Sequence, residues 1–216
     1  PINNIVVCNQ DSIEIVFTTQ NTGGVTTYAW TNTNTSIGLA ANGTGTIASF
    51  TAINTSTVTQ SATITVTPTF ENGGNSNTGS AVTFTITVNP TAQVESINSQ
   101  VLCNGESTDA ISFTTTNTDG TTSYSWTNDN TSTGLAASGT GDITPFTAIN
   151  TSNSSIGSTI TVTPTYTNNG ISCTGPTETF TITVNPTAQV EANDSQVLCN
   201  GESTDAISFT TTNTDG

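Results

Sequence analysis

The chain has 216 residues and contains no Lys, Arg, His or Met, so its 15 Asp and Glu residues give it a formal net charge of −15. Without His or Lys it cannot form a Ser-His-Asp triad, a His-ligated metal site, a P-loop or a Schiff base, and we expect no enzyme activity. Without cations it has nothing to neutralise phosphates, so we expect neither nucleic acid nor an anionic membrane as a partner.

The pattern of apolar residues predicts strands. Apolar residues occur two apart in each of four segments of the first repeat unit, and Thr fills most of the positions between them in the last two. Such alternation is typical of half-buried strands, and β-branched Thr suits their exposed faces. In chain order these segments are 13–17, 28–30, 62–70 and 82–88. Gly-rich and Asn-rich turns separate them, and no window has helical periodicity.

Tyr-x-Trp occurs where a third strand is expected. Tyr28 and Trp30 lie two residues apart, at inward positions of the alternation, as do Tyr124 and Trp126 in the second copy. A core Trp on the third strand is typical of immunoglobulin-like sandwiches, so we predict that these four aromatic residues belong to the cores.

The sequence repeats itself. The segment from Pro90 recurs almost unchanged from Pro186, a period of 96 residues, which is the size of one immunoglobulin-like domain. Cys8 and Cys103 are only 95 residues apart, so one residue was gained or lost early in the unit. We expect the chain to be a piece of a longer repeat protein.

Three units follow from this period. They are a first repeat at 1–89, a second repeat at 90–185, and the start of a third repeat at 186–216. Asn-Pro-Thr follows the last strand of each complete repeat, and Pro stiffens such a junction. We therefore predict an all-β chain of tandem immunoglobulin-like antiparallel β-sandwiches that form an elongated rod.

The units carry a recurring set of motifs. Both complete repeats contain Cys, Tyr-x-Trp-Thr, Gly-Leu, Gly-Thr-Gly-x-Ile, Phe-Thr-Ala-Ile-Asn, Ile-Thr-Val-Thr-Pro-Thr and Thr-Phe-Thr-Ile-Thr-Val-Asn-Pro, although the first copy is more diverged. In the second repeat these lie at Cys103, 124–127, 133–135, 139–143, 146–150, 160–165 and 179–186. The unit resembles the PKD-like, immunoglobulin-like repeat of giant surface adhesins of the Bacteroidetes, and is similar to the SprB-type adhesins linked to gliding motility and type IX secretion. The resemblance implies an extracellular protein at the bacterial cell surface.

The family's paired cysteines are complete only in the second repeat. There the resemblance implies a Cys103–Cys173 disulfide, which would suit an exported protein. It requires the two residues to lie at the same end of the sandwich. Cys199 repeats Cys103, and Cys8 would face Asn77, so we expect Cys8 to lack a partner within its repeat. A metal or redox role for the cysteines is the weaker alternative, because no His or second nearby Cys accompanies them.

Two further site hypotheses concern a modification and an ion. Asp11-Ser12-Ile13 resembles the O-glycosylation acceptor of this bacterial phylum, which makes Ser12 a candidate. We expect no cofactor. Calcium at the domain junctions is an alternative, but the scattered acids lack the spacing of a calcium loop and are expected to be solvated turn residues.

The function predicted from the sequence is mechanical. We expect a stalk or filament segment of a long adhesin, with neighbouring repeats of the same chain as its partners, and other filament chains or external surfaces as further ones. The alternative is a binding module whose loops contact glycans or surfaces, which exposed loop aromatics would favour. A catalytic domain is the third alternative, and the absence of His, Lys and Arg argues against it.

Overall fold

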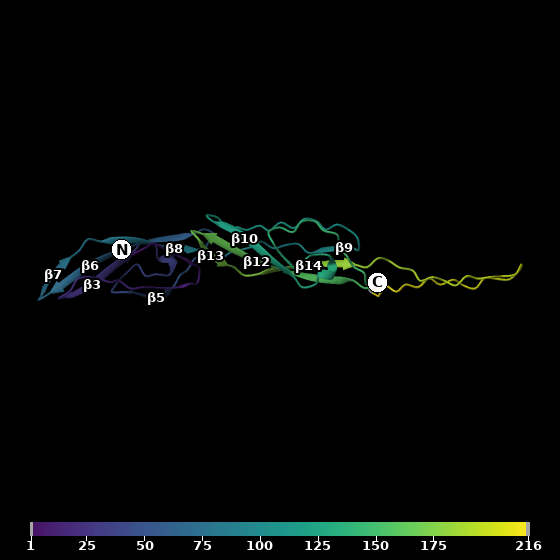
Figure 1. Cartoon of the computed structure of the whole chain (residues 1–216), viewed down its shortest axis with the longest axis horizontal. Helices are drawn as coiled ribbons and strands as arrows, with labels where there is room; N and C mark the ends of the chain where they lie inside the picture. Colours follow the sequence, from purple (N-terminus) through teal and green to yellow (C-terminus); the bar gives the residue numbers. More distant parts are fainter. Residues whose placement is uncertain (1, 215–216) are drawn as a thin grey trace. The chain divides into compact units, whose positions relative to one another are not determined.

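The computed structural model describes residues 2–214 and confirms the predicted all-β class. The elements of the first repeat are β1 (Ile5–Cys8), β2 (Ser12–Ile15), β3 (Val25–Asn32), the 3-10 turn η1 (Thr35–Ile37), β4 (Asn42–Thr44), β5 (Ile47–Thr51), β6 (Gln60–Asn72), β7 (Asn75–Thr78) and β8 (Val82–Asn89). Those of the second are β9 (Gln100–Cys103), β10 (Thr121–Asn128), η2 (Thr131–Thr133), β11 (Ser138–Thr140), β12 (Ile156–Asn168), β13 (Ile171–Thr174) and β14 (Glu178–Asn185). The segment 186–214, yellow in Figure 1, forms no strand.

Each repeat has one large sheet with the same strand order. In the first repeat the order is β1-β8-β6-β3-β4, with β7 paired to β6, and β2 pairs with β5 in a second sheet. β3, β6 and β8 lie along one another in Figure 1. In the second repeat the order is β11-β10-β12-β14-β9, with β13 paired to β12. The first strand pairs in parallel with the last in both, and the other neighbours are antiparallel. This is an immunoglobulin-like arrangement.

The two sheets of the first repeat enclose one hydrophobic core. Ile15 from β2 and Ile47 from β5 belong to the same buried cluster as Trp30 from β3 and Ile64 from β6. Along β6 and β8 the inward positions are buried and most outward positions carry Thr, as the alternation predicted.

The four predicted core aromatic residues differ in burial. Trp30 and Trp126 are each only 7% exposed, whereas Tyr28 and Tyr124 are half-buried. Tyr28 packs on Phe17, with the ring centroids 5.3 Å apart. A Cβ on Gly43 would lie 2.2 Å from Cζ2 of Trp30. The first position of the repeated Gly-Thr-Gly motif must therefore be glycine, because a larger residue would collide with the indole.

The change of spacing near the first cysteine has a structural counterpart. β2 and β5 form a short ladder with an irregularity between Ile13 and Ile15. The equivalent segments of the second repeat keep only two isolated bridges, Ser107 with Thr147 and Ile111 with Ile143. With its one extra residue, the second repeat has four residue steps between the two bridges on both segments, whereas in the first repeat three steps from Ser12 to Ile15 face four from Ile47 to Thr51.

The chain folds into two compact units that do not coincide with the repeats. Unit 1 comprises Pro1–Glu95, Thr114–Tyr124 and Thr163–Thr177. Unit 2 comprises Ser96–Phe113, Ser125–Val162 and Glu178–Gly216. Unit 1 therefore contains the whole first repeat together with three segments of the second, 90–95, 114–124 and 163–177. That 1–89 and 90–185 are independently folding domains remains a prediction.

Candidate functional site: the disulfide-linked junction

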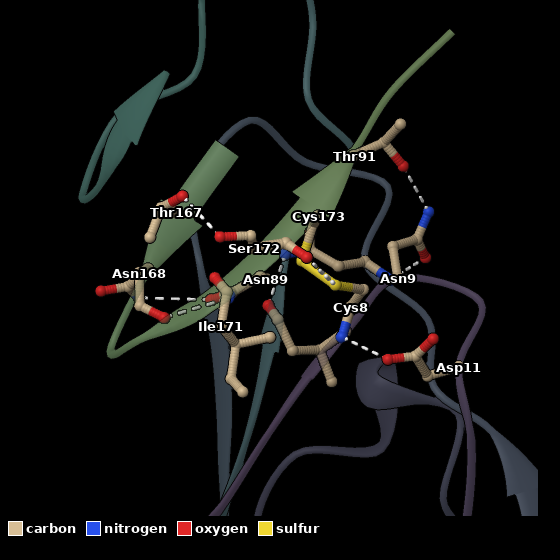
Figure 2. The surroundings of a disulfide bond; sticks show 12 residues. Cys8, Asn9, Asp11, Asn89, Thr91, Thr167, Asn168, Ile171, Ser172 and Cys173 are labelled. Carbon is tan, nitrogen blue, oxygen red and sulfur yellow. Dashed lines mark hydrogen bonds between the residues drawn. A yellow bond between two sulfur atoms is a disulfide. The ribbon is translucent and has the colours of Figure 1, made fainter. Parts of the chain in front are cut away.

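Within unit 1 a disulfide joins the two repeats. It links Cys8 at the end of β1 to Cys173 in β13, residues 165 positions apart, with an S–S distance of 2.03 Å and a Cα–Cα distance of 5.5 Å. Figure 2 shows this bond, in yellow, between the two segments. It replaces the Cys103–Cys173 pair expected from the sequence, and Cys103 is an exposed free thiol.

The register of the large sheet explains why the two cysteine positions of one repeat do not pair. Cys8 lies opposite Asn89 at the end of β8, which borders the first residues of β6. Asn77, the counterpart of Cys173, lies opposite Phe70 near the other end of β6. About ten strand residues separate these two places, or roughly 33 Å. A disulfide needs Cα atoms within about 7 Å, and the second repeat has the same register.

A tight turn holds Cys8 in place. The Cys8 backbone N–H donates to Oδ2 of Asp11 at 2.8 Å, and the Asn9 N–H extends the pairing with β8 by donating to the Asn89 carbonyl at 3.0 Å. The Asn9 side-chain amide donates to Oγ1 of Thr91 at 2.8 Å. The acid of this turn is therefore a structural acceptor for the backbone, a role that the sequence interpretation of solvated turn acids missed.

The β12–β13 hairpin presents Cys173. Its turn residues Asn169 and Gly170 both have positive φ, 49° and 77°, as a two-residue hairpin turn requires. The side chain of Asn89 donates to the carbonyls of Asn168 and Ile171 at 3.4 and 3.5 Å, and Asn168 donates back to Oδ1 of Asn89 at 3.2 Å (Figure 2). Asn89 is fully buried, and these bonds satisfy its amide group.

A second contact joins the repeats inside unit 1. Oδ1 of Asn117 accepts from the Gln93 N–H at 2.8 Å, and its amide donates to the carbonyls of Thr91 and Thr57 at 3.1 and 3.5 Å. The Thr118 N–H also donates to the Thr57 carbonyl, at 3.1 Å. One loop of the second repeat is thus hydrogen-bonded to a loop of the first, beside the Pro90 connection.

Tyr166 supports the same loop from inside. Its side chain is fully buried, and its hydroxyl donates to the Thr118 carbonyl at 2.8 Å. Desolvation and the neighbouring Asp119 carboxylate raise the pKa of Tyr166 above its usual value of about 10, so the hydroxyl stays protonated and keeps donating. The first repeat has Phe70 at this position and cannot make the bond.

Each repeat also contains a buried asparagine that sequence reasoning missed. The Asn54 amide donates to the carbonyls of Val58 and Val88, both at 2.8 Å, and its Oδ1 accepts from the backbone and hydroxyl of Ser56. Its own N–H donates to Oδ1 of Asn9 at 2.8 Å, which connects it to the cysteine turn. Asn150 makes the same set of bonds in the second repeat, and both side chains are 2% exposed. The repetition of Phe-Thr-Ala-Ile-Asn was the available signal.

The other site hypotheses from the sequence concern glycosylation of Ser12 and a metal ion. Ser12 is exposed on β2, and its hydroxyl is 2.7 Å from that of Ser49. Its glycosylation stays a prediction. Within residues 2–214 no three His, Cys, Asp or Glu side chains gather as a metal site would need. In the same part of the chain, no helix is long and apolar enough to cross a membrane.

A shallow cleft of about 360 Å³ lies in the first repeat. Its lining includes Phe17, Thr26, Tyr28, Val66 and Pro68. The hydroxyl groups of Thr26 and Tyr28 are buried without a hydrogen-bond partner. This cleft is the feature that favours a ligand-binding role.

Comparison with known proteins adds information on the fold alone. No family model and no curated protein matches the chain. Similar solved structures include three N-terminal domains of the outer capsid protein Hoc of bacteriophage RB49, at 12% identity and a TM-score of 0.44, covering 86% of this chain and 67% of that one. A SusE-like surface-located polysaccharide-binding protein of Bacteroides thetaiotaomicron has 16% identity and a TM-score of 0.28, with 88% of this chain and 34% of that one covered.

The insect immune protein hemolin has 11% identity and a TM-score of 0.35, with 85% of this chain and 45% of hemolin covered. The chain thus spans less than half the length of the last two structures. Identity and structural similarity are low in all three, and they assign no ligand or activity to this chain.

Proposed function

We propose that the chain is a load-bearing stalk segment of a long bacterial surface adhesin. The observation that carries this proposal is the Cys8–Cys173 disulfide, which fastens two successive repeats covalently. Disulfides persist in oxidising environments outside the cytosol, which supports an extracellular location. Two further parts of the proposal, a role in gliding motility and export by type IX secretion, are based on the resemblance of the repeat motifs.

The position of the disulfide suits a chain under tension. A force applied to the two ends passes through residues 1–8, across the S–S bond, and on through the residues after Cys173. The 165 residue steps between the two cysteines then cannot be pulled out, although they contain most of both repeats. With the disulfide intact, loss of hydrogen bonds under force would lengthen such a stalk only slightly. Without the disulfide, the residues between the two cysteines would unfold and extend.

Single-molecule force spectroscopy tests this directly. The oxidised chain, pulled from its ends, should extend less than the Cys8→Ser, Cys173→Ser double variant by about 580 Å, because each residue contributes about 3.5 Å of contour length. The Cys103→Ser variant is the matched control and should extend like the unaltered chain. Equal final extension of the oxidised chain and the double variant would contradict the load-bearing role.

We also propose that the repeats are the folding units and that their stiff Pro junctions give an extended stalk. Limited digestion with a protease of broad specificity should remove the segment after about residue 186 and spare 1–185. Small-angle scattering of chains with increasing repeat number should show a maximum dimension that grows nearly linearly. Uniform digestion of the whole chain, or a compact particle, would argue against this arrangement.

The second candidate function is ligand binding, and the cleft beside Tyr28 is the observation that favours it. A stalk segment should show no measurable affinity on a glycan array. A hit that Tyr28→Phe weakens, with the Tyr124→Phe variant as control, would move the assignment to a binding module.

A further inference from the structure

Cys103 occupies the same structural position as Cys8 but is an exposed free thiol. It lies opposite Asn185, as Cys8 lies opposite Asn89. Its N–H donates to Oε2 of Glu106 at 2.7 Å, which reproduces the bond from Cys8 to Asp11.

The residues that follow Cys103 repeat the rest of the turn. The Asn104 amide donates to Oγ1 of Thr187 at 3.0 Å, as Asn9 does to Thr91. Asn104 also accepts from the Asn150 N–H at 2.8 Å, the distance found between Asn54 and Asn9. The bonding partners and distances therefore place Cys103 in a turn built like the one that holds the bonded Cys8.

The far end of the second repeat is less covered than that of the first. Ala92 is fully buried, and a Cβ on Gly175, beyond β13, would lie 1.9 Å from its carbonyl oxygen. Ala188, the counterpart of Ala92, is exposed, and Asn185 is half-buried where Asn89 is fully buried. The hairpin that would cover them by the repeat period lies 96 residues beyond β12 and β13, past position 216.

The segment from Pro186 is already seated as the start of a next repeat would be. Oδ1 of Asn213 accepts from the Gln189 N–H at 2.9 Å, and its amide donates to the carbonyls of Asn153 and Thr187 at 3.3 and 3.2 Å. The Thr214 N–H donates to the Asn153 carbonyl at 3.2 Å. Each of these bonds has its counterpart around Asn117 in unit 1, where the disulfide accompanies them.

We propose that Cys103 is the acceptor of a disulfide from a following repeat, through a cysteine on a hairpin of the β12–β13 type. The first cysteine of each repeat would then bond the second-position cysteine of the next, so that successive repeats form one covalently linked series. Asn77 in place of cysteine means that the first repeat cannot be bonded in this way to a repeat before it. This inference concerns connectivity and stands independently of the adhesin role.

The bond requires an oxidant, which we take to be a disulfide such as glutathione disulfide. The Cys103 thiolate attacks it, releases one reduced glutathione and forms a mixed disulfide. The hairpin thiolate then attacks Sγ of Cys103, forms the inter-repeat S–S bond and releases the second reduced glutathione. Two thiols lose two protons and two electrons in total, and one glutathione disulfide is reduced.

The test uses the full chain extended after residue 216 by a copy of residues 121–185, which completes a third repeat. The extended chain is oxidised in a glutathione buffer, digested without reduction and mapped by mass spectrometry. We expect Cys103 linked to the added cysteine, Cys8 still linked to Cys173, and Cys199 free. In a matched variant whose added cysteine is replaced by Asn, as at position 77, Cys103 should be alkylated as a free thiol.

Two results would overturn the proposal. One is a bond between Cys199 and the added cysteine, which would be the within-repeat pairing. The other is a free Cys103 in an extended chain whose third repeat is folded, as shown by slow amide exchange of the added copy of β12. An unfolded third repeat beside intact first and second repeats would equally contradict it, because the seated start at 186–214 would then not lead to a docked repeat.

Discussion

The junction at Asn89 and the junction at Asn185 have the same sequence but different surroundings. Both make the same local bonds, from the cysteine turn to the Thr of Asn-Pro-Thr and from a buried asparagine to the last strand. In the first, a hairpin about 80 residues further along the chain buries Asn89 and adds the disulfide. In the second, Ala188 and Cys103 are exposed. Short-range sequence thus suffices for the turn geometry, and burial of the junction depends on a distant segment.

The largest expected effect comes from removing the disulfide, which is present at the first junction and absent at the second. The Cys8→Ser, Cys173→Ser double variant should lose up to about 5 kcal/mol in free energy of unfolding, because the bond closes a loop of about 166 residues in the unfolded chain. Urea denaturation measures this as a lower midpoint. The Cys103→Ser variant should stay within about 0.5 kcal/mol of the unaltered chain, since its thiol is exposed and unbonded. Equal losses in both variants would mean that the bond is not what distinguishes the junctions.

The second effect should be alike at both junctions. Asn54→Ala and Asn150→Ala each leave two carbonyls without their donor in a buried place, which should cost about 3 kcal/mol in the repeat concerned. Thermal unfolding followed by Trp fluorescence reports on each repeat through its own core Trp. Thr55→Ala and Thr151→Ala, next to them and exposed, are the controls and should change little. A loss confined to one repeat would show that the matching bonds are not equivalent in energy.

The third effect tests whether Asn117 at the first junction is better shielded from water than Asn213 at the second. Asn117→Ala removes bonds from a side chain that is 9% exposed, and should raise amide exchange of Gln93 about tenfold or more, equivalent to about 1.4 kcal/mol. Asn213→Ala removes the matching bonds at a more open place, where water can replace them, so the Gln189 amide should respond less. Hydrogen exchange followed by NMR compares the two amides in one sample. An equal response would indicate that the hairpin adds no protection to the first junction.

The sequence predicted the strands well and the disulfide badly, for one physical reason. Alternation of apolar residues and Thr depends on the local two-residue period, so it predicts the inward faces of β6 and β8 and the place of Trp30. The partner of a cysteine depends on strand register and on how one repeat meets the next. Cys103 and Cys173 share a repeat, yet the register puts their positions at opposite ends of the sheet. The burial of Asn54 and Asn150 was not predicted, because Asn is common in the turns of this chain and nothing in the local sequence distinguishes a buried Asn from one in a turn.

The smallest expected effect concerns the turn itself. Gln10 has φ of 75°, a conformation that side chains with a Cβ disfavour, and Gly105 and Gly201 stand at its counterparts with φ of 89° and 90°. Gln10→Gly should therefore raise the free energy of unfolding of the first repeat by up to about 1 kcal/mol, less the entropy that Gly loses on folding. Gly105→Gln, the reverse change in the second repeat, should lower it by a similar amount, and a Cβ there would meet no neighbouring atom within 4 Å, so crowding cannot explain the loss. Urea midpoints of the two variants, read from the Trp of each repeat, should move in opposite directions. A shift of the same sign in both would mean that backbone conformation is not what the two glycines contribute, and that the turns around Cys8 and Cys103 are held by different forces.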